Sequence, residues 1–457
     1  MSRDLATPSS DLQDYYDHVP PVHRISNYST LSGSQQRDFS LGQNIPLTAA
    51  VSSSAINLSQ EPYTDLPDAS NLPARTRPHF GDRRGESVDS PYVEEKSRAG
   101  KRKLWVLGGL AVLVIATILA IVLGVVLSRK TSSTSSSDNS ISGDPSQFSK
   151  DSRLKQSFWG IAYTPEGTLY PDCGAKLSDV VTDMQLLSQL TTRIRVYGAD
   201  CNTTALVLDA IQLTKTNLAV YIANYPNSDD NGEAYDRQKS AIQSAIQTYG
   251  TDHIAGVTVG NEFILDYLDD NGGTDANSVV GNAGAEILLA FINDTRSMLS
   301  DLGVSLKIGN ADAGSYFNDM VLENVDYGMA NVHPWFANQS INDAAGWTWN
   351  FFETTDVVLA KTLSNDPEMS IAETGWPTNS TNAGNESDGP STASEDNLQK
   401  FLNTFVCQAN TNGTEYFFFE YFDETWKTEK YGGVEGYWGL FYSNRTLKNI
   451  EIPDCSS

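Results

Sequence analysis

Short runs of β-branched and aromatic residues alternate with amphipathic segments from about residue 155 onward. Eight of these runs predict strands, at 157–165, 193–199, 218–225, 255–262, 305–311, 325–335, 369–376 and 414–422. Seven segments with apolar residues at i, i+3, i+4 and i+7 predict helices, at 175–190, 204–214, 234–249, 283–302, 315–325, 347–363 and 395–409. The alternation predicts an α/β fold, a (β/α)8 TIM barrel. An open doubly wound sheet would need a glycine-rich phosphate turn after its first strand, and GIAYTPEG is not one.

An unbroken apolar stretch at 104–127 precedes this region. Its 24 residues are enough to cross a bilayer as one helix. The stretch begins too far into the chain and is too long to be a signal peptide, and a buried core helix of this length would rarely lack a polar face. Lys and Arg are dense before it and sparse after it, so the positive-inside rule predicts a type II membrane protein with a cytosolic N-terminus.

The composition divides the chain into four parts. Residues 1–103 are rich in Ser, Asp, Pro and Arg without periodicity, which predicts a disordered cytosolic tail. The membrane helix at 104–127 is followed by a Ser/Thr-rich stalk at 128–154 and the barrel domain at 155–457. Residues 131–457 hold 17 basic and 44 acidic side chains, a net charge of −27, which excludes a nucleic-acid partner. Nothing in the sequence sets the oligomeric state.

The four cysteines all lie in the barrel region. No CxxC pair occurs, and only His253 and His333 are found there, which disfavours a zinc site. We therefore expect two disulfides rather than four free thiols. Of the three possible connectivities, the more local one is favoured, with the pairs Cys173–Cys201 and Cys407–Cys455.

No metal or organic cofactor is indicated. The acidic run 269–273 lacks the spacing of an EF-hand and is expected to be a solvated loop. Seven N-x-S/T sequons lie beyond the membrane stretch and predict N-glycosylation of the exported part, at Asn202, Asn293, Asn338, Asn379, Asn385, Asn412 and Asn444.

Two predicted strands end in carboxylates. The fourth finishes Val259-Gly260-Asn261-Glu262, and the seventh runs through Ala372-Glu373 into Thr374. A carboxylate at the end of an apolar strand costs several kcal/mol to bury unless it is paired or hydrogen bonded, so its presence points to a function. Because strand ends converge at one mouth of a barrel, Glu262 and Glu373 match the paired carboxyls of a glycosidase, retaining or inverting.

A family resemblance sharpens this prediction. The segments GIAYTP, RVYGADC, TVGNEF, NVHPWF, AETGWPT and FDETWK resemble family 17 glycoside hydrolases, the β-1,3-glucanases and glucanosyltransferases of fungal walls and plants. The similarity covers roughly residues 155–455, and the whole layout resembles the membrane-anchored fungal β-1,3-endoglucanases. It implies a retaining endo-β-1,3-glucanase at the plasma membrane that faces the cell wall. Transfer of glucan to a second glucan, or a non-catalytic wall sensor that binds glucan, remain alternatives.

The resemblance also implies residue roles. Glu262 matches the general acid/base and Glu373 the nucleophile, and Asn261 resembles the asparagine that binds the sugar 2-hydroxyl. Arg195 and Tyr197 share one face of the second strand, from which Arg195 would keep Glu373 ionised.

Five further residues are candidates for substrate contact. Tyr163 resembles the family's subsite tyrosine, and His333 is either a partner of the nucleophile or a core residue. Glu424 and Lys427 match an acidic and basic pair of the family, with an exposed i,i+3 ion pair as the alternative. Among the tryptophans, Trp376 is the preferred stacking platform for a sugar ring because it follows Glu373 by three residues.

Overall fold

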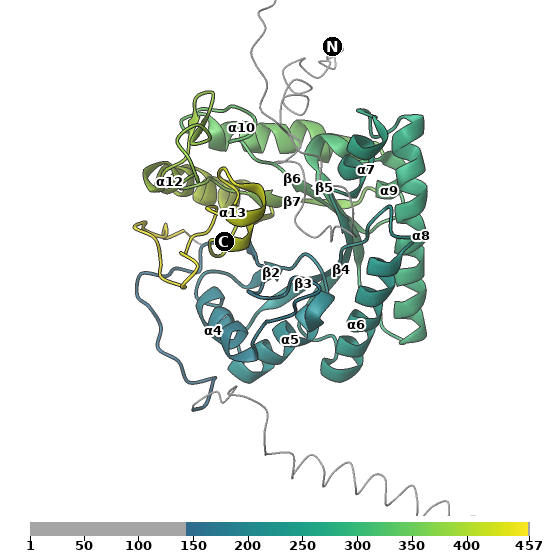
Figure 1. The fold of residues 1–457 in the computed structure, drawn as a ribbon, viewed down its shortest axis with the longest axis horizontal. Helices are drawn as coiled ribbons and strands as arrows, with labels where there is room; N and C mark the ends of the chain where they lie inside the picture. Colours follow the sequence, from purple (N-terminus) through teal and green to yellow (C-terminus); the bar gives the residue numbers. More distant parts are fainter. Residues whose placement is uncertain (1–142, 456–457) are drawn as a thin grey trace, which may run out of the picture. The chain divides into compact units, whose positions relative to one another are not determined.

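Eight parallel strands close into a barrel in the order β1-β10-β7-β6-β5-β4-β3-β2 in the computed structural model, which describes residues 143–455 (Figure 1). The strands are β1 Gly160–Ala162, β2 Arg193–Arg195, β3 Ala219–Asn224, β4 Ile254–Asn261, β5 Ile308–Ala313, β6 Tyr327–Asn331, β7 Glu368–Thr374 and β10 Tyr416–Phe418. The predicted α/β barrel and its eight strands are confirmed. Most strands are shorter than predicted, because the chain leaves the ladder soon after reaching the mouth.

The strands are surrounded by helices (Figure 1). The longer ones are α4 Leu177–Leu187, α5 Thr203–Thr214, α6 Glu233–Tyr249, α7 Phe263–Asn271, α8 Val279–Asp301, α10 Ala344–Phe351, α12 Glu395–Asn412 and α13 Thr425–Tyr431. Short helical turns complete the set, at η1 Asp200–Asn202, η2 Gly314–Tyr316, α9 Asp319–Leu322, η3 Phe352–Val357 and α11 Val358–Ala360. A small hairpin joins β8 Ser387–Asp388 to β9 Ser391–Thr392.

The helix predictions failed at the mouth of the barrel. The helix predicted at 315–325 is only η2 and the four-residue α9. Conversely, α7 and α13 were missed, because each has fewer than ten residues and too few turns to establish a periodicity. α7 begins two residues after β4 ends, and α13 begins seven residues after β10 ends, so both lie on the carboxyl side of their strands.

Aromatic side chains fill the interior of the barrel. The Tyr221 ring packs edge-on against Tyr327 and Phe417, at centroid distances of 5.5 and 5.4 Å. Gly309 on β5 makes room for this layer, since a Cβ there would overlap the Tyr327 ring. The barrel is therefore a packed core that opens only at its ends.

Two irregularities in the strand ladder lie near the carboxyl ends of the strands. The β4–β5 register shifts between Thr258 and Asn261, and the β6–β7 register shifts between Ala330 and Asn331. Such bulges re-aim the side chains that follow them. Here they turn residues of β4, β6 and β7 toward the mouth.

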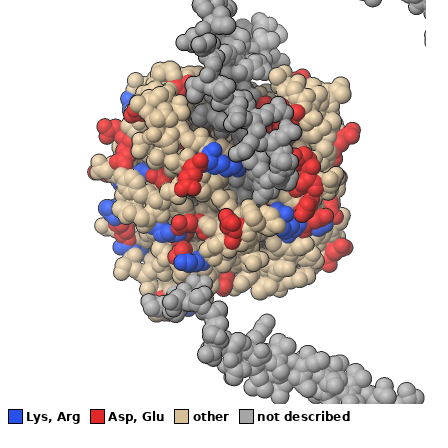
Figure 2. All heavy atoms as spheres, in the orientation of Figure 1, with Lys and Arg blue, Asp and Glu red and all other residues tan. Residues whose placement is uncertain are grey.

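Both disulfides have the predicted pairing. Cys173–Cys201 ties the loop after β1 to the turn after β2, and Cys407–Cys455 ties α12 to the C-terminal segment. All seven predicted glycosylation asparagines lie on the surface of the described domain. Figure 2 shows Asp and Glu side chains spread over the visible face among fewer Lys and Arg, in keeping with the acidic composition.

Part of the predicted layout lies outside the described residues. This holds for the tail at 1–103, the membrane segment at 104–127 and the stalk up to residue 142. Across residues 143–455, none of the helices is both long enough and apolar enough to span a bilayer.

Asp356, in the π-helical turn η3, is a fully buried carboxyl with no hydrogen-bond partner for either oxygen among the described residues. Burial raises its pKa well above the usual value. The unfolded chain therefore loses this proton first, and stability is lost as the pH rises from the unfolded pKa toward the folded one. We expect Asp356→Asn to be more stable than the wild type by about 1–3 kcal/mol at pH 8. The gain should disappear near pH 4, as measured by urea unfolding; an equal gain at both pH values would contradict this account.

Candidate active site

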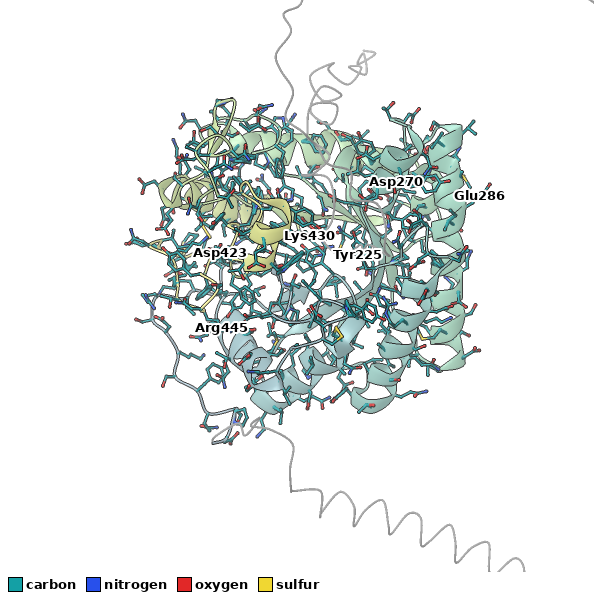
Figure 3. The ribbon with its side chains drawn as sticks, in the orientation of Figure 1. Tyr225, Asp270, Glu286, Asp423, Lys430 and Arg445 are labelled. Atoms are coloured by element: carbon teal, nitrogen blue, oxygen red, sulfur yellow. A yellow bond between two sulfur atoms is a disulfide. The ribbon has the colours of Figure 1, made fainter. Side chains whose placement is uncertain are left out.

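Polar side chains from five strands converge at the carboxyl end of the barrel. They include Arg195 at the end of β2, Asn331 at the end of β6 and Glu373 near the end of β7. Glu262 follows β4 and Glu420 follows β10. In the view of Figure 3, Tyr225 from just after β3 and Lys430 from α13 lie near the centre of the ring of strands. The two sequence-predicted glutamates therefore belong to one mouth.

Glu373 is buried between cationic and hydrogen-bonding groups. Arg195 Nη1 lies 3.4 Å from Oε1, and His333 Nε2 lies 3.2 Å from Oε2. Burial alone would raise the pKa of Glu373, but the His333 hydrogen bond, the Arg195 charge and a hydrogen bond from Tyr197 outweigh it. The pKa of Glu373 consequently lies below its usual value, and the group is a carboxylate at neutral pH.

The pKa of Glu262 is shifted in the opposite direction. Burial and the nearby negative charge of Glu373 raise the pKa of Glu262 well above its usual value. Asn331 Nδ2 donates to its Oε1 over 2.8 Å, which opposes the rise only in part. Glu262 is therefore held protonated at a pH at which Glu373 is ionised. Its backbone is left-handed, with φ 55°, at the point where β4 turns into α7.

Arg195 connects the two carboxyls. Its guanidinium crosses the barrel from β2, and Nη2 donates to Asn261 Oδ1 over 2.8 Å. Nη1 contacts Asn331 Oδ1 at 3.5 Å as well as Glu373. A continuous path thus runs from Glu262 through Asn331 and Arg195 to Glu373. Arg195 is 1% exposed and lies over the Tyr197 ring, so its position is fixed by its surroundings.

A second charged cluster flanks the site on the side of β10. Lys427 Nζ lies 2.9 and 3.1 Å from the two oxygens of Glu420 and 3.5 Å from Glu424. Burial alone would lower the pKa of Lys427, but the charges of the two glutamates outweigh it and raise it. All three side chains are buried, so the alternative of an exposed pair at Glu424 and Lys427 is wrong.

We expect Lys427→Met to destabilise the domain by about 3–5 kcal/mol, because it leaves two carboxyls buried without their cation. The double variant Lys427→Met/Glu420→Gln should recover much of this loss, since it also removes the buried partner charge. Urea unfolding of the wild type and both variants measures the difference. A double variant no more stable than the single one would show that Lys427 contributes through packing instead of charge.

Two sequence-predicted substrate contacts are corrected. The Trp376 ring is fully buried, stacks near Phe401, and its Nε1 donates to the Thr392 carbonyl at 2.9 Å. It offers no face to a sugar. Tyr163 is 1% exposed, and its hydroxyl donates to Asp183 at 2.7 Å in a network beneath the surface. Both side chains are directed toward the surrounding helices, Trp376 toward α12 and Tyr163 toward α4.

Two residues of the site, Glu420 and Asn331, were missed from the sequence. Glu420 obeys the rule of a carboxylate at a strand end, which would have found it, but the run FFFEYF looks like an uninterrupted aromatic strand. Asn331 carries no such signal. Trp426, in the FDETWK segment, is the partly exposed tryptophan here: its Nε1 donates to Glu424 at 2.6 Å, and it lines a shallow pocket together with Thr164.

Among residues 143 to 455, no cluster of three or more His, Cys, Asp or Glu side chains is arranged to hold a metal ion. The site contains two carboxyls, Glu262 protonated and Glu373 ionised, which are joined through Asn331 and the buried Arg195. That arrangement suits acid and nucleophilic catalysis at a glycosidic bond.

A closed (β/α)8 barrel with a pair of carboxyls at its mouth is an arrangement found in glycoside hydrolases. More particularly, the chain belongs to the family of the BtgE/BtgC glycoside hydrolase domain, whose model matches residues 160–439. It is 37% identical over 319 residues to a putative glucan endo-1,3-β-glucosidase of Aspergillus niger, covering 66% of this chain and 44% of the relative. With the probable glucan endo-1,3-β-glucosidase of Aspergillus flavus it shares 33% identity over 396 residues, covering 80% and 56%. The chain spans about half the length of these curated relatives.

Solved structures share the fold. A family 17 β-1,3-glucanosyltransferase of Rhizomucor miehei superposes with a TM-score of 0.52 at 24% identity, covering 66% of this chain and 99% of that one. An endo-laminarinase from Formosa superposes with a TM-score of 0.51 at 18% identity, covering 66% and 92%. These similarities show that the barrel fold is shared with both solved structures.

Proposed function

We propose that this protein is a retaining endo-β-1,3-glucanase in which Glu373 is the nucleophile and Glu262 the general acid/base. The observation that carries the proposal is the convergence of Glu262 and Glu373 at one barrel mouth, joined through Asn331 and Arg195, and the opposite directions of their pKa shifts agree with it. The names of the curated relatives, glucan endo-1,3-β-glucosidases, support β-1,3-glucan as the substrate. So does the Rhizomucor miehei neighbour, whose mutant was solved in complex with laminaritriose.

The first step uses both glutamates. Ionised Glu373 attacks the anomeric carbon, while the Glu262 carboxyl gives its proton to the departing glycosidic oxygen. A covalent glycosyl-enzyme forms on Glu373, and the shortened glucan leaves with a new hydroxyl group. Arg195 and His333 keep Glu373 unprotonated before the attack.

The same arrangement serves the second step, the hydrolysis of the glycosyl-enzyme. Once Glu373 is esterified, its negative charge is gone, and with it one of the causes that raise the pKa of Glu262. Glu262 is then a carboxylate able to take a proton from the incoming water. Asn261 Oδ1 accepts a hydrogen bond from Arg195, which leaves its Nδ2 as the donor for the sugar 2-hydroxyl.

Glucanosyl transfer is a second candidate, favoured by the Rhizomucor miehei transferase, of which 99% is covered by the similarity. The two functions differ only in whether water or a sugar hydroxyl resolves the glycosyl-enzyme. Incubation with defined laminari-oligosaccharides distinguishes them: shorter products alone mean hydrolysis, and products longer than the substrate mean transfer. A domain that binds these oligosaccharides without converting them, or one that cuts only β-1,6-linked oligomers, would contradict the proposal.

The proposed location is the plasma membrane, with the barrel facing the cell wall in a type II orientation. The apolar stretch 104–127 with its basic N-terminal flank supports this, as do two disulfides and seven exposed sequons, which suit an exported domain. Protease treatment of intact protoplasts tests it with the full-length chain. The barrel should be released while an N-terminal tag stays protected, and the reverse pattern would refute the orientation.

A further inference from the structure

Asp312, near the end of β5, is a buried carboxyl that the proposed reaction does not use. It is 0% exposed, lies on the strand next to β4, and belongs to none of the sequence motifs that suggested the site. One of its carboxyl oxygens contacts the segment that carries Glu262.

The Asp312 carboxylate holds the first turn of α7. Oδ2 accepts a hydrogen bond from the Ile264 backbone N–H at 3.0 Å, and the Leu265 N–H lies within reach as well. Oδ1 accepts from the Ala313 N–H at 3.0 Å. Glu262 occupies the N-cap position of α7, yet its own side chain makes no capping bond. A neighbouring strand therefore supplies the cap, which leaves the Glu262 carboxyl available at the mouth.

The backbone of Glu262 is held from both sides by β5. Its N–H donates to the Ala311 carbonyl at 3.1 Å, and two residues later Asp312 takes the Ile264 N–H. Between these two anchors Glu262 adopts a left-handed conformation that non-glycine residues rarely occupy. Such a conformation persists only where the surroundings enforce it.

The charge of Asp312 also affects the pKa of Glu262. Burial raises the pKa of Asp312 to about 7 in spite of its backbone hydrogen bonds, so it is partly ionised at neutral pH. The titratable groups that raise the pKa of Glu262 come from three elements: Glu373 from β7, Asp266 from α7 and Asp312 from β5. The polar neighbour from β6, Asn331, acts in the opposite direction.

We propose that Asp312 is a positioning residue that acts through Glu262: it anchors the start of α7 and so aims the acid/base carboxyl at the glycosidic oxygen. This inference rests on the proposed function. It assigns no contact between Asp312 and substrate. A residue of this kind affects only those steps in which Glu262 transfers a proton.

The test compares two donors in the full-length protein. Cleavage of laminari-oligosaccharides needs an acid that protonates the leaving oxygen. In a 2,4-dinitrophenyl β-laminarioside, the leaving group is 2,4-dinitrophenolate, which departs without a proton. For Asp312→Asn we expect kcat/KM to fall about 10- to 100-fold on the oligosaccharide and less than about threefold on the dinitrophenyl donor. The alkaline limb of the pH profile should also move to lower pH, because a negative charge near Glu262 is lost. Glu368→Gln, an exposed carboxyl at the amino-terminal end of β7, serves as the control and should change neither value.

The outcomes separate the two proposals. Glu262→Gln is run beside Asp312→Asn, and it must show the same preference for the activated donor if Glu262 is the acid. If Glu262→Gln lacks that preference, the proposed function fails. If Glu262→Gln shows it while Asp312→Asn loses activity equally on both donors or keeps the wild-type pH profile, only the positioning role is overturned. Should Asp312→Asn not fold, Asp312→Ser, whose hydroxyl can accept one of the same bonds, takes its place.

Discussion

Replacing Glu373 by alanine is expected to lower kcat on laminarin by about 10⁴-fold or more. Without this carboxylate no glycosyl-enzyme forms, and neither Arg195 nor His333 can substitute as an attacking group. Alanine also leaves space beside the anomeric carbon. Azide should fill that space, attack an activated β-laminariosyl donor and give the α-glycosyl azide, because only one displacement then occurs. Reducing-sugar release and NMR of the azide product measure the two effects.

The control for this experiment lies on the same strand. Glu368, at the opposite end of β7, is exposed and pairs with Lys307 on the surface. Glu368→Gln should therefore keep wild-type activity. If Glu373→Ala retained more than about one percent of activity, or if azide gave the β-product, another residue would be the nucleophile.

Replacing Glu262 by alanine is expected to produce a different defect. Cleavage of laminarin should slow by about 10²- to 10⁴-fold, because the leaving oxygen departs without a proton. With a dinitrophenyl donor the first step should proceed almost normally, and the glycosyl-enzyme should then accumulate because no base activates water. Mass spectrometry of the trapped protein measures this intermediate. Added azide should restore turnover and give the β-glycosyl azide.

The contrast between the azide products assigns the two roles. An α-product from Glu373→Ala and a β-product from Glu262→Ala are expected, and exchanged products would exchange the roles. Wild-type kcat should depend on pH in a bell shape. Its acidic limb reports protonation of Glu373, whose pKa is lowered, and its alkaline limb reports ionisation of Glu262, whose pKa is raised.

The barrel and the two glutamates could be predicted from the sequence for a simple reason. A buried parallel strand reads as an apolar run, and a carboxylate at its end stands out against that background. In a barrel all such ends meet at one mouth, so Glu262 and Glu373 could be brought together without coordinates. Local spacing likewise favoured the disulfide pairs that the structure contains.

The finer site could not be predicted, because it depends on contacts across the barrel. Arg195 on β2 reaches β4, β6 and β7, none of which is its neighbour in the sheet. The link through Asn331 depends on a register shift that no sequence pattern announces. The prediction that Trp376 is a sugar platform was wrong because it relied on proximity along the chain alone. Trp376 is close to Glu373 in sequence, but its ring packs in the core against α12.

The most direct test of the account follows the anomeric configuration of the first product by proton NMR. Wild-type protein is mixed with laminari-oligosaccharide, and spectra are recorded before mutarotation equilibrates the new reducing end. Two successive displacements at one carbon, with Glu373 as the intermediate ester, predict that the β-anomer appears first and the α-anomer only later. Initial release of the α-anomer would mean a single displacement by water, and the assignment of Glu373 as a covalent nucleophile would be wrong.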